Sequence, residues 1–188
     1  MKYLKYILGI IAILAIAFIL LGFIKPKLSY DCEIMVDKPV AESWAVIQDQ
    51  EKLSEWLPGF QKIEHISGTP GTVGAVSDVY FDANGEQTVI RETITDIVPN
   101  ESISMTYTSD FMDMDYTMNM SSNNGITKIY SSTTVVGNGA FSKSMVALIG
   151  SGIKGQEETN LVNIKKTIEQ NTKDYLPVEE SSIESKED

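Results

Sequence analysis

Residues 144–172 read SMVALIGSGIKGQEETNLVNIKKTIEQNT and carry the only long helical pattern that follows the N-terminal segment. The apolar residues of this stretch recur at helical spacing and form one stripe, which consists of Ile149, Ile153, Leu161, Ile164 and Ile168. The charged residues, Glu157 and Glu158 among them, are assigned to the remaining surface. The pattern predicts a long helix that covers one face of a sheet, because a sheet with one apolar face needs a partner layer.

Three glycines interrupt the first half of this predicted helix. Gly150, Gly152 and Gly155 each cost about 1 kcal/mol relative to alanine in a helix interior. Either a neighbouring element approaches the helix closely and the wall is thin there, or the first turns of the helix are irregular. The sequence leaves both interpretations open.

Residues 28–139 read as strands joined by tight turns, with two short helices after the first strand. Alternating apolar and polar residues mark seven strands, at Leu28–Val36, Phe60–Ser67, Ala75–Asp82, Gln87–Val98, Ile103–Thr108, Met112–Ser121 and Ile126–Val136. The first short helix is led by Pro39 with Asp37 as its N-cap, and the second runs from Leu53 to Trp56. The sequence therefore predicts an α+β domain.

Three short motifs carry a resemblance to a known superfamily. Residues 37–44 read DKPVAESW, residues 53–59 read LSEWLPG and residues 71–74 read GTVG. With the order of elements from about Leu28 to Thr172, they resemble the START/birch-pollen-allergen superfamily (SRPBCC), which includes polyketide cyclase/dehydrase and lipid-transport proteins. The resemblance implies a helix-grip fold, in which a seven-stranded curved antiparallel sheet wraps around a long C-terminal helix and encloses an apolar cavity.

Tyr6 to Ile24 is an uninterrupted, uncharged run made almost entirely of Ile, Leu, Phe and Ala. At ~1.5 Å per residue it spans roughly 28 Å, close to the hydrocarbon thickness of a bilayer. No stretch of small residues follows that would suit cleavage of a signal peptide. We therefore expect a single-pass anchor in the cell (inner) membrane. Lysines lie on both sides of it, and their slight balance favours a cytoplasmic N-terminus with the domain outside the cytoplasm.

The chain thus divides into an anchor at residues 1–27, a START-like domain at residues 28–175 and a tail at residues 176–188. The tail carries five acidic residues and no core-forming pattern, so we expect it to be disordered.

Acidic residues dominate the chain beyond the predicted anchor. Four of the 15 Lys and Arg residues and none of the 26 Asp and Glu residues precede Leu28, which leaves 11 basic against 26 acidic residues from there on. This charge argues against nucleic acid as a partner. A single cysteine, Cys32, and a single histidine, His65, exclude an internal disulfide and a Cys/His metal cluster. We expect no cofactor, no metal and a monomeric chain.

One predicted strand is rich in methionine. Its residues Met112, Met114, Tyr116, Met118 and Met120 share one face. Methionine is flexible and polarisable, so the strand predicts either the wall of a ligand cavity or an ordinary core filled with methionine. The last predicted strand opposes it with small residues that fill space poorly. The residues expected to line a cavity are Met105, Tyr107, Met112, Met114, Tyr116, Met118, Met120, Ile129, Ser131, Thr133, Ile149 and Ile153.

Glu92 is the one candidate for acid–base chemistry. It shares the phase of Ile90 and Ile94, which predicts an inward side chain with a raised pKa and a tyrosine, Tyr107 or Tyr116, within reach. The alternative is a bulge or edge position with the carboxylate in water.

Three functions are compatible with these features. The first is a membrane-tethered binding or carrier module for a hydrophobic small molecule, such as a lipid, a quinone or a polyketide-like compound. The second is a cyclase/dehydrase-type enzyme that uses Glu92 as a buried carboxylate. The third is a protein-interaction domain with a filled core. We interpret the chain as the first, and as a binding protein rather than an enzyme.

Overall fold

The structure is a computed structural model that describes residues 2–83 and 85–175. The predicted disordered tail at residues 176–188 lies outside the described residues. The strands are β1 Leu28–Val36, β2 Phe60–Ser67, β3 Val76–Ala83, β4 Glu86–Val98, β5 Ser102–Thr108, β6 Met112–Asn123 and β7 Ile126–Gly137. The helices are α1 Lys2–Ile24, α2 Val40–Gln48, α3 Leu53–Trp56 and α4 Ala140–Glu169, with a 3₁₀ helix, η1, at Gln50–Lys52.

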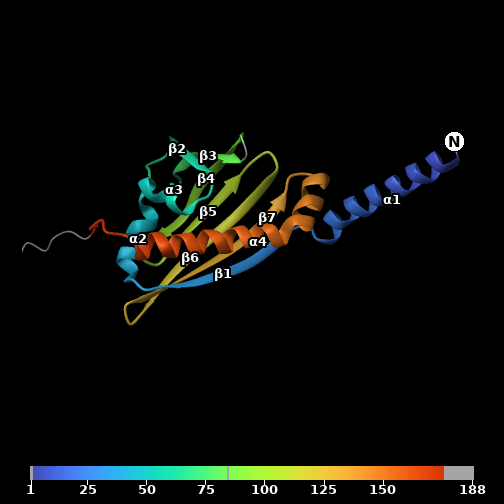
Figure 1. Cartoon of the computed structure of the whole chain (residues 1–188). Coiled ribbons are helices and arrows are strands. Elements are labelled where there is room, and N and C mark those ends of the chain that lie inside the picture. Colours follow the sequence, from blue (N-terminus) through green and yellow to red (C-terminus); the bar gives the residue numbers. More distant parts are fainter. Residues whose placement is uncertain (1, 84, 176–188) are drawn as a thin grey trace, which may run out of the picture.

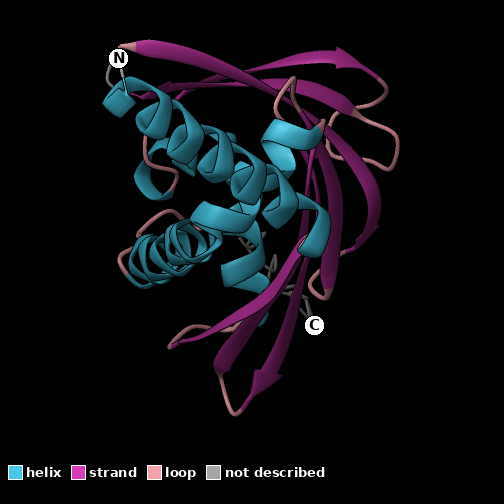
Figure 2. Cartoon of the chain, turned by 90° about the vertical axis from the view of Figure 1, so that its right-hand side faces the viewer, coloured by secondary structure: helices cyan, strands magenta, loops and turns pink. Residues whose placement is uncertain are grey.

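The seven strands form one antiparallel sheet in the order β1-β7-β6-β5-β4-β3-β2. The sheet curves around the helices, and α4 runs along its concave side (Figures 1 and 2). The register between β4 and β5 shifts between Ile94 and Asp96, and a bulge of this kind bends a strand and increases its twist. The predicted α+β helix-grip fold is confirmed.

The long helix differs from its prediction in two respects. It begins at Ala140 rather than Ser144 and ends at Glu169 rather than Thr172. Its buried stripe is also shifted, because in the first turns the stripe passes through Val146 and Gly150 instead of Ile149. Ile149 lies one position off this stripe and is 42% exposed. In the second half the predicted stripe holds, with the buried residues Leu161, Ile164 and Ile168.

The glycines of α4 have different surroundings. A Cβ atom on Gly150 would lie 3.1 Å from Cδ1 of Leu28, so β1 approaches the helix closely at that point. A Cβ atom on Gly152 or on Gly155 would meet no neighbouring element of the described chain within 4 Å. The helix is continuous through all three, so the interpretation as irregular first turns was wrong.

The helix α1 packs against the start of α4. Gly22 is buried there, and a Cβ atom on it would lie 2.6 Å from the backbone nitrogen and Oγ of Ser144. Oγ of Ser144 lies 2.9 Å from the Ala140 carbonyl within α4 and 3.3 Å from the carbonyl of Ile19 in α1. The rings of Phe18 and Phe141 pack with their centroids 5.6 Å apart. The predicted anchor is therefore docked on the domain, while the rest of α1 projects away from it (Figure 1).

The C-terminal end of α4 is hydrogen-bonded to the segment that precedes α2. The predicted N-cap at Asp37 was wrong, because α2 begins at Val40 with Pro39 as its N-cap and without a side-chain cap. The backbone N–H of Asp37 instead donates to the Glu169 carboxylate at 2.9 Å.

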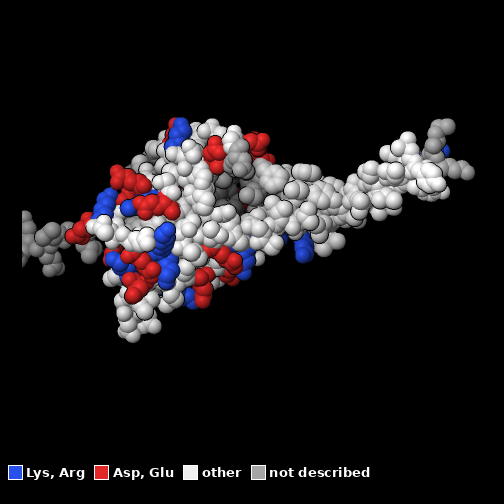
Figure 3. Space-filling view, viewed as in Figure 1, with Lys and Arg blue, Asp and Glu red and all other residues white. Residues whose placement is uncertain are grey.

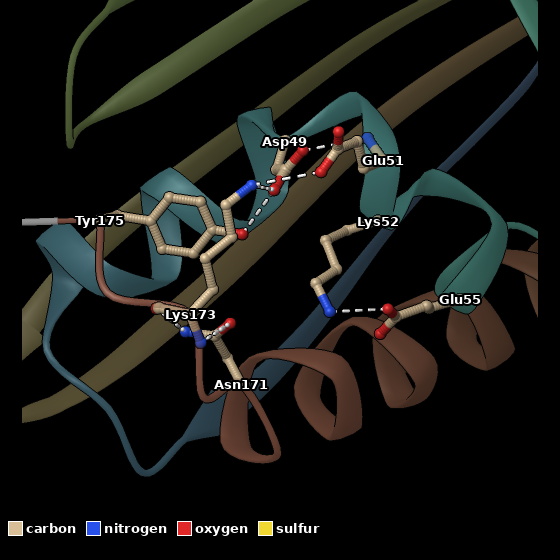
Figure 4. Close-up of polar contacts among 7 residues, drawn as sticks. All are labelled: Asp49, Glu51, Lys52, Glu55, Asn171, Lys173 and Tyr175. Carbon is tan, nitrogen blue, oxygen red and sulfur yellow. Dashed lines mark hydrogen bonds and ion pairs between the residues drawn. The ribbon is translucent and has the colours of Figure 1, made fainter.

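A polar cluster holds the segment after α4 against η1 (Figure 4). Nζ of Lys173 lies 2.8 Å from the Asp49 carboxylate and 3.3 Å from that of Glu51. The Tyr175 hydroxyl donates to Asp49 at 2.6 Å. The Lys173 ammonium and the Tyr175 hydroxyl stabilise the charged carboxylate and lower the pKa of Asp49 from 3.8 to about 2. The cluster fixes η1, and with it the adjoining α3, beside α4.

Candidate ligand-binding cavity

A cavity of about 700 Å³ lies between the concave face of the sheet, α3 and the middle of α4. Its wall is mostly apolar and draws residues from β1 to β6. The volume falls within the roughly 300–1,000 Å³ of sites for small organic ligands. The domain is therefore hollow where α4 passes over the sheet.

Seven of the residues predicted to line a cavity are on its wall: Met105, Tyr107, Met112, Met114, Tyr116, Met118 and Ile153. They come from β5, β6 and α4. The register places Tyr116 opposite Met105 and Met114 opposite Tyr107, so this part of the wall is one continuous surface across two strands. That a ligand binds against it stays a prediction.

The other five predicted residues, Met120, Ile129, Ser131, Thr133 and Ile149, lie elsewhere. Met120 and Ile129 belong to the packed core, together with Leu161, Ile164 and Ile168 of α4. Ser131 and Thr133 are buried, and the wall beside them is formed by Tyr30 and Tyr116 of the neighbouring strands. Ile149 faces outward from the first turns of α4. Alternation places residues on the correct face of a strand, but it does not show where along the strand the helix closes the cavity.

Glu157 is the main residue that the sequence interpretation placed wrongly. It was assigned to the outer surface of α4, yet it lines the cavity. The spacing contained the signal, because Glu157 lies four residues after Ile153 and four before Leu161, on the inward stripe. Its charge favours exposure, because glutamate is almost never fully buried without a partner. Tyr30, Leu53 and Trp56 also line the cavity and were not predicted to do so.

The Glu157 carboxylate faces the sheet. Its Oε1 accepts a hydrogen bond from the Tyr116 hydroxyl at 3.1 Å. Desolvation raises the pKa of Glu157 above 4.5, although the nearby hydroxyls of Ser131 and Tyr116 act in the opposite direction. Within the described residues, Oγ of Ser131 is buried and has no hydrogen-bond partner within bonding geometry.

Glu92 lies on the opposite side of the cavity. It stands on β4, an internal strand, three residues before the bulge, and its side chain lines the cavity. Desolvation raises the pKa of Glu92 above 4.5, and the adjacent Tyr107 hydroxyl partly offsets this. The Tyr107 hydroxyl also lies 3.3 Å from Sδ of Met105. A catalytic role for Glu92 stays a prediction.

The two tyrosines connect the two carboxyl groups. The rings of Tyr107 and Tyr116 meet edge to face with their centroids 6.4 Å apart. Burial, followed by the neighbouring carboxylate in each case, raises the pKa of both hydroxyls far above 10.0. Both tyrosines therefore stay protonated and act as hydrogen-bond donors at neutral pH.

The remaining titratable residues named from the sequence are more exposed. His65 also lines the cavity, but its side chain is exposed and its Nε2 lies 2.9 Å from the carbonyl of Gly68. Asp113 and Asp115 point outward, to Asn138 and Thr106 respectively. Among residues 2–83 and 85–175, no group of three His, Cys, Asp or Glu side chains is placed to hold a metal ion.

Solved structures share this fold at low sequence identity. The aromatase/cyclase Zhui from Streptomyces sp. R1128 is 15% identical, covers 78% of this chain and 96% of its own, and superposes with a TM-score of 0.65. Ara h 8.0201 is 18% identical, with 77% and 99% coverage and a TM-score of 0.64. The di-domain aromatase/cyclase BexL is 15% identical, with 78% and 52% coverage and a TM-score of 0.63. No match was found among curated proteins.

The family comparison covers nearly the whole domain. The profile described as polyketide cyclase / dehydrase and lipid transport matches residues 28–169, from the first residue of β1 to the last of α4. These are the elements that enclose the cavity, and they carry the fold that the solved relatives share. The chain therefore belongs to the polyketide cyclase/dehydrase and lipid transport family, within the START/birch-pollen-allergen (SRPBCC) superfamily.

Proposed function

We propose that the chain is a monomeric, membrane-tethered module that binds a hydrophobic small molecule in the cavity between the sheet and α4. The observation that carries this proposal is the cavity of about 700 Å³ with its mostly apolar wall. Removing an apolar ligand from water stabilises its complex by about 25 cal/mol per Å² of buried surface. A domain with a filled core offers no such surface, so the cavity counts against the third function, a protein-interaction domain.

Four methionines support a binding role. Met105, Met112, Met114 and Met118 form one region of the wall. Their side chains adopt several conformations at low cost, which suits a site that repacks around different apolar shapes. This is the property expected of a binding or carrier module.

Membrane tethering is supported by α1. Tyr3–Ile24 has a mean hydropathy of 3.2, and 6% of its most apolar window is buried against the domain. An exposed apolar surface of this length is unfavourable in water and suits a bilayer. In Figure 3 the charged side chains gather on the domain, mainly at its end away from α1, whereas α1 beyond its junction with the domain is almost entirely uncharged. We place the anchor in the cell (inner) membrane with the domain on the extracytoplasmic side.

The two cavity carboxyls favour a second candidate, an enzyme of the cyclase/dehydrase kind. Glu92 and Glu157 both have pKa values raised by desolvation, which is how proteins tune carboxyls for general acid–base catalysis. In that case Glu92→Gln abolishes turnover, whereas in a binding module it leaves the affinity for an apolar ligand nearly unchanged.

Photolabelling tests the binding proposal. The full chain in lipid nanodiscs is irradiated with an alkane that carries a diazirine, and labelled peptides are mapped by mass spectrometry. We expect labels on β5, β6 and the middle of α4, and loss of these labels in Ile153→Trp, which fills the cavity. The control is Val162→Trp, because Val162 lies on the same helix and is 57% exposed. Absence of label in the wild-type cavity overturns the proposal.

Membrane fractionation tests the tether. The full chain is expected to stay in the membrane fraction after an alkaline carbonate wash, with an intact mass that includes the N-terminal residues. Release of a mature chain that begins near Lys25 or later contradicts the anchor.

A further inference from the structure

Two carboxyl groups line the cavity, and no lysine or arginine among the described residues of its wall compensates their charge. Glu157 enters from α4 and Glu92 from β4. The basic side chain on the described wall is His65, which is exposed and has its Nε2 2.9 Å from the Gly68 carbonyl. Arg91, the basic residue next to Glu92 in sequence, pairs with Asp78 at 2.8 Å, and its side chain is 54% exposed. Lys154, one turn from Glu157, lies 3.7 Å from Glu158 on the outer surface.

An anionic head group beside Glu92 and Glu157 would therefore be buried without a lysine or arginine partner on the described wall. Burying an unpaired charge is strongly unfavourable, and two nearby carboxyls add repulsion wherever they are ionised. A carboxylate or phosphate ligand would gain only neutral donors: the Tyr116 hydroxyl already donates to Glu157, and the Trp56 Nε1–H, unpaired among the described residues, is a single donor that does not balance a full negative charge. The common anionic lipids thus fit this cavity poorly.

A ligand group that donates hydrogen bonds, in contrast, finds acceptors in this cavity. An ionised carboxylate accepts about four hydrogen bonds, so Glu157 keeps free acceptor capacity beyond its bond from Tyr116. Glu92 likewise lies near the hydroxyl of Tyr107 without a cation. A ligand hydroxyl or amine that donates to either carboxylate forms a charge-assisted hydrogen bond, which is roughly twice as strong as a neutral one.

We propose that this site selects hydrophobic molecules whose polar group donates hydrogen bonds, a hydroxyl or an amine, and rejects those with a carboxylate or phosphate. This inference rests on the proposed function, because it concerns the polarity of the same cavity. It assigns the recognition of the polar group to Glu157 and Glu92, while the methionines contact the apolar part.

A matched series of photoprobes tests the selection. Three twelve-carbon chains carry the same diazirine and differ only in their end group: an alcohol, an amine or a carboxylate. The full chain in nanodiscs is labelled at pH 7.5, and label in the cavity peptides is divided by label in α1. Because α1 contacts the bilayer in the proposed topology, this ratio corrects for how much of each probe enters the lipid. We expect the ratio for the alcohol and the amine to exceed that for the carboxylate about tenfold or more.

Variants assign the effect to the two carboxyls. In Glu157→Gln and in Glu92→Gln, the labelling ratio of the alcohol divided by that of the carboxylate is expected to fall at least about threefold below its wild-type value. The control is Glu158→Gln, which removes the same charge from the adjacent, exposed position and is expected to change nothing. A carboxylate probe that labels the wild-type cavity as strongly as the alcohol overturns the inference. If neither the plain alkane nor any probe labels the cavity, the proposed function itself fails.

Discussion

The Tyr116 hydroxyl donates a hydrogen bond of 3.1 Å to the Glu157 carboxylate, and this bond joins the middle of β6 to the middle of α4. It is the point where a charged residue enters the inward stripe of the helix. Because Tyr116 is buried, the bond lies in a partly desolvated region, where an unpaired partner is costly. Glu157 therefore lines the cavity and also contributes to the pH dependence of stability.

Glu157→Gln is expected to change that pH dependence. The pKa of Glu157 is raised in the folded state, so its stabilising contribution is present below the ordinary value of 4.5 and is lost as the pH rises through the folded pKa. The variant does not titrate, and its Tm relative to wild type is expected to be higher at pH 8 than at pH 5. Thermal unfolding across this range measures the difference. A difference that does not change with pH would show that Glu157 is exposed.

Glu92→Gln is expected to change the pH dependence of the Tm in the same direction as Glu157→Gln. Desolvation raises the pKa of Glu92 and the Tyr107 hydroxyl lowers it, with desolvation the larger effect. Tyr107→Phe removes the group that lowers this pKa, so it should raise the pKa of Glu92 further. Titration followed by the carboxyl carbon signal in NMR measures the shift directly. A lower pKa in Tyr107→Phe would contradict the assigned contact.

Met118→Ala and Met120→Ala form a matched pair. Both side chains are buried on β6 in the same core cluster, but Met118 also lines the cavity and Met120 does not. Met120→Ala should cost about 2–5 kcal/mol of unfolding free energy, the usual range for such a core site. Met118→Ala should cost less, because part of its surface already borders empty space, and it should alter labelling by the alkane probe. Equal costs together with unchanged labelling would support an ordinary methionine core.

Asp49→Asn is expected to weaken the contact between η1 and the segment after α4. The pKa of Asp49 is lowered to about 2, so its stabilising contribution is present above 3.8 and is lost as the pH falls through about 2. Lys173 is half exposed, so we expect a loss on the order of 1 kcal/mol at neutral pH, shrinking below pH 4. Chemical denaturation at several pH values measures it. The control is Lys52→Met, which breaks the neighbouring ion pair with Glu55 and leaves the Asp49 cluster intact (Figure 4).

Gly22→Leu is expected to separate α1 from α4, since a Cβ atom on Gly22 already meets Ser144 at 2.6 Å. A short bismaleimide between cysteines placed at Phe18 and Phe141 reports the contact. Cross-linking should fall several-fold in Gly22→Leu and stay unchanged in Gly9→Leu, because Gly9 has open space within 4 Å. Equal cross-linking in the two variants would contradict the docked arrangement.

Strand alternation and turn residues predicted the sheet correctly, because they record local backbone requirements that the fold preserves. The same patterns placed Met112, Met114 and Met118 on the face that borders the cavity. Assignments that depend on contacts between distant elements were less accurate. The charge of Glu157 predicts exposure although its spacing places it on the inward stripe, and it lines the cavity. Ile149 was predicted to line the cavity, but the buried stripe of α4 is shifted by one residue there. The docking of α1 through Gly22 left no pattern in the sequence, because a single glycine in an apolar helix has many explanations.

The close contact between Gly22 and Ser144 restricts how the domain can move. Only residues 25–27 connect α1 to β1, and the two helices touch on the α1 side of that connection. From Ser144 to Glu157 the helix rises about 20 Å, so the carboxyl group stays at a set distance from the docking point. In the proposed topology the domain therefore cannot swing across a gap to deliver cargo to a second membrane. Ligand must be exchanged locally, at one height above the lipid surface, with whatever diffuses to that position.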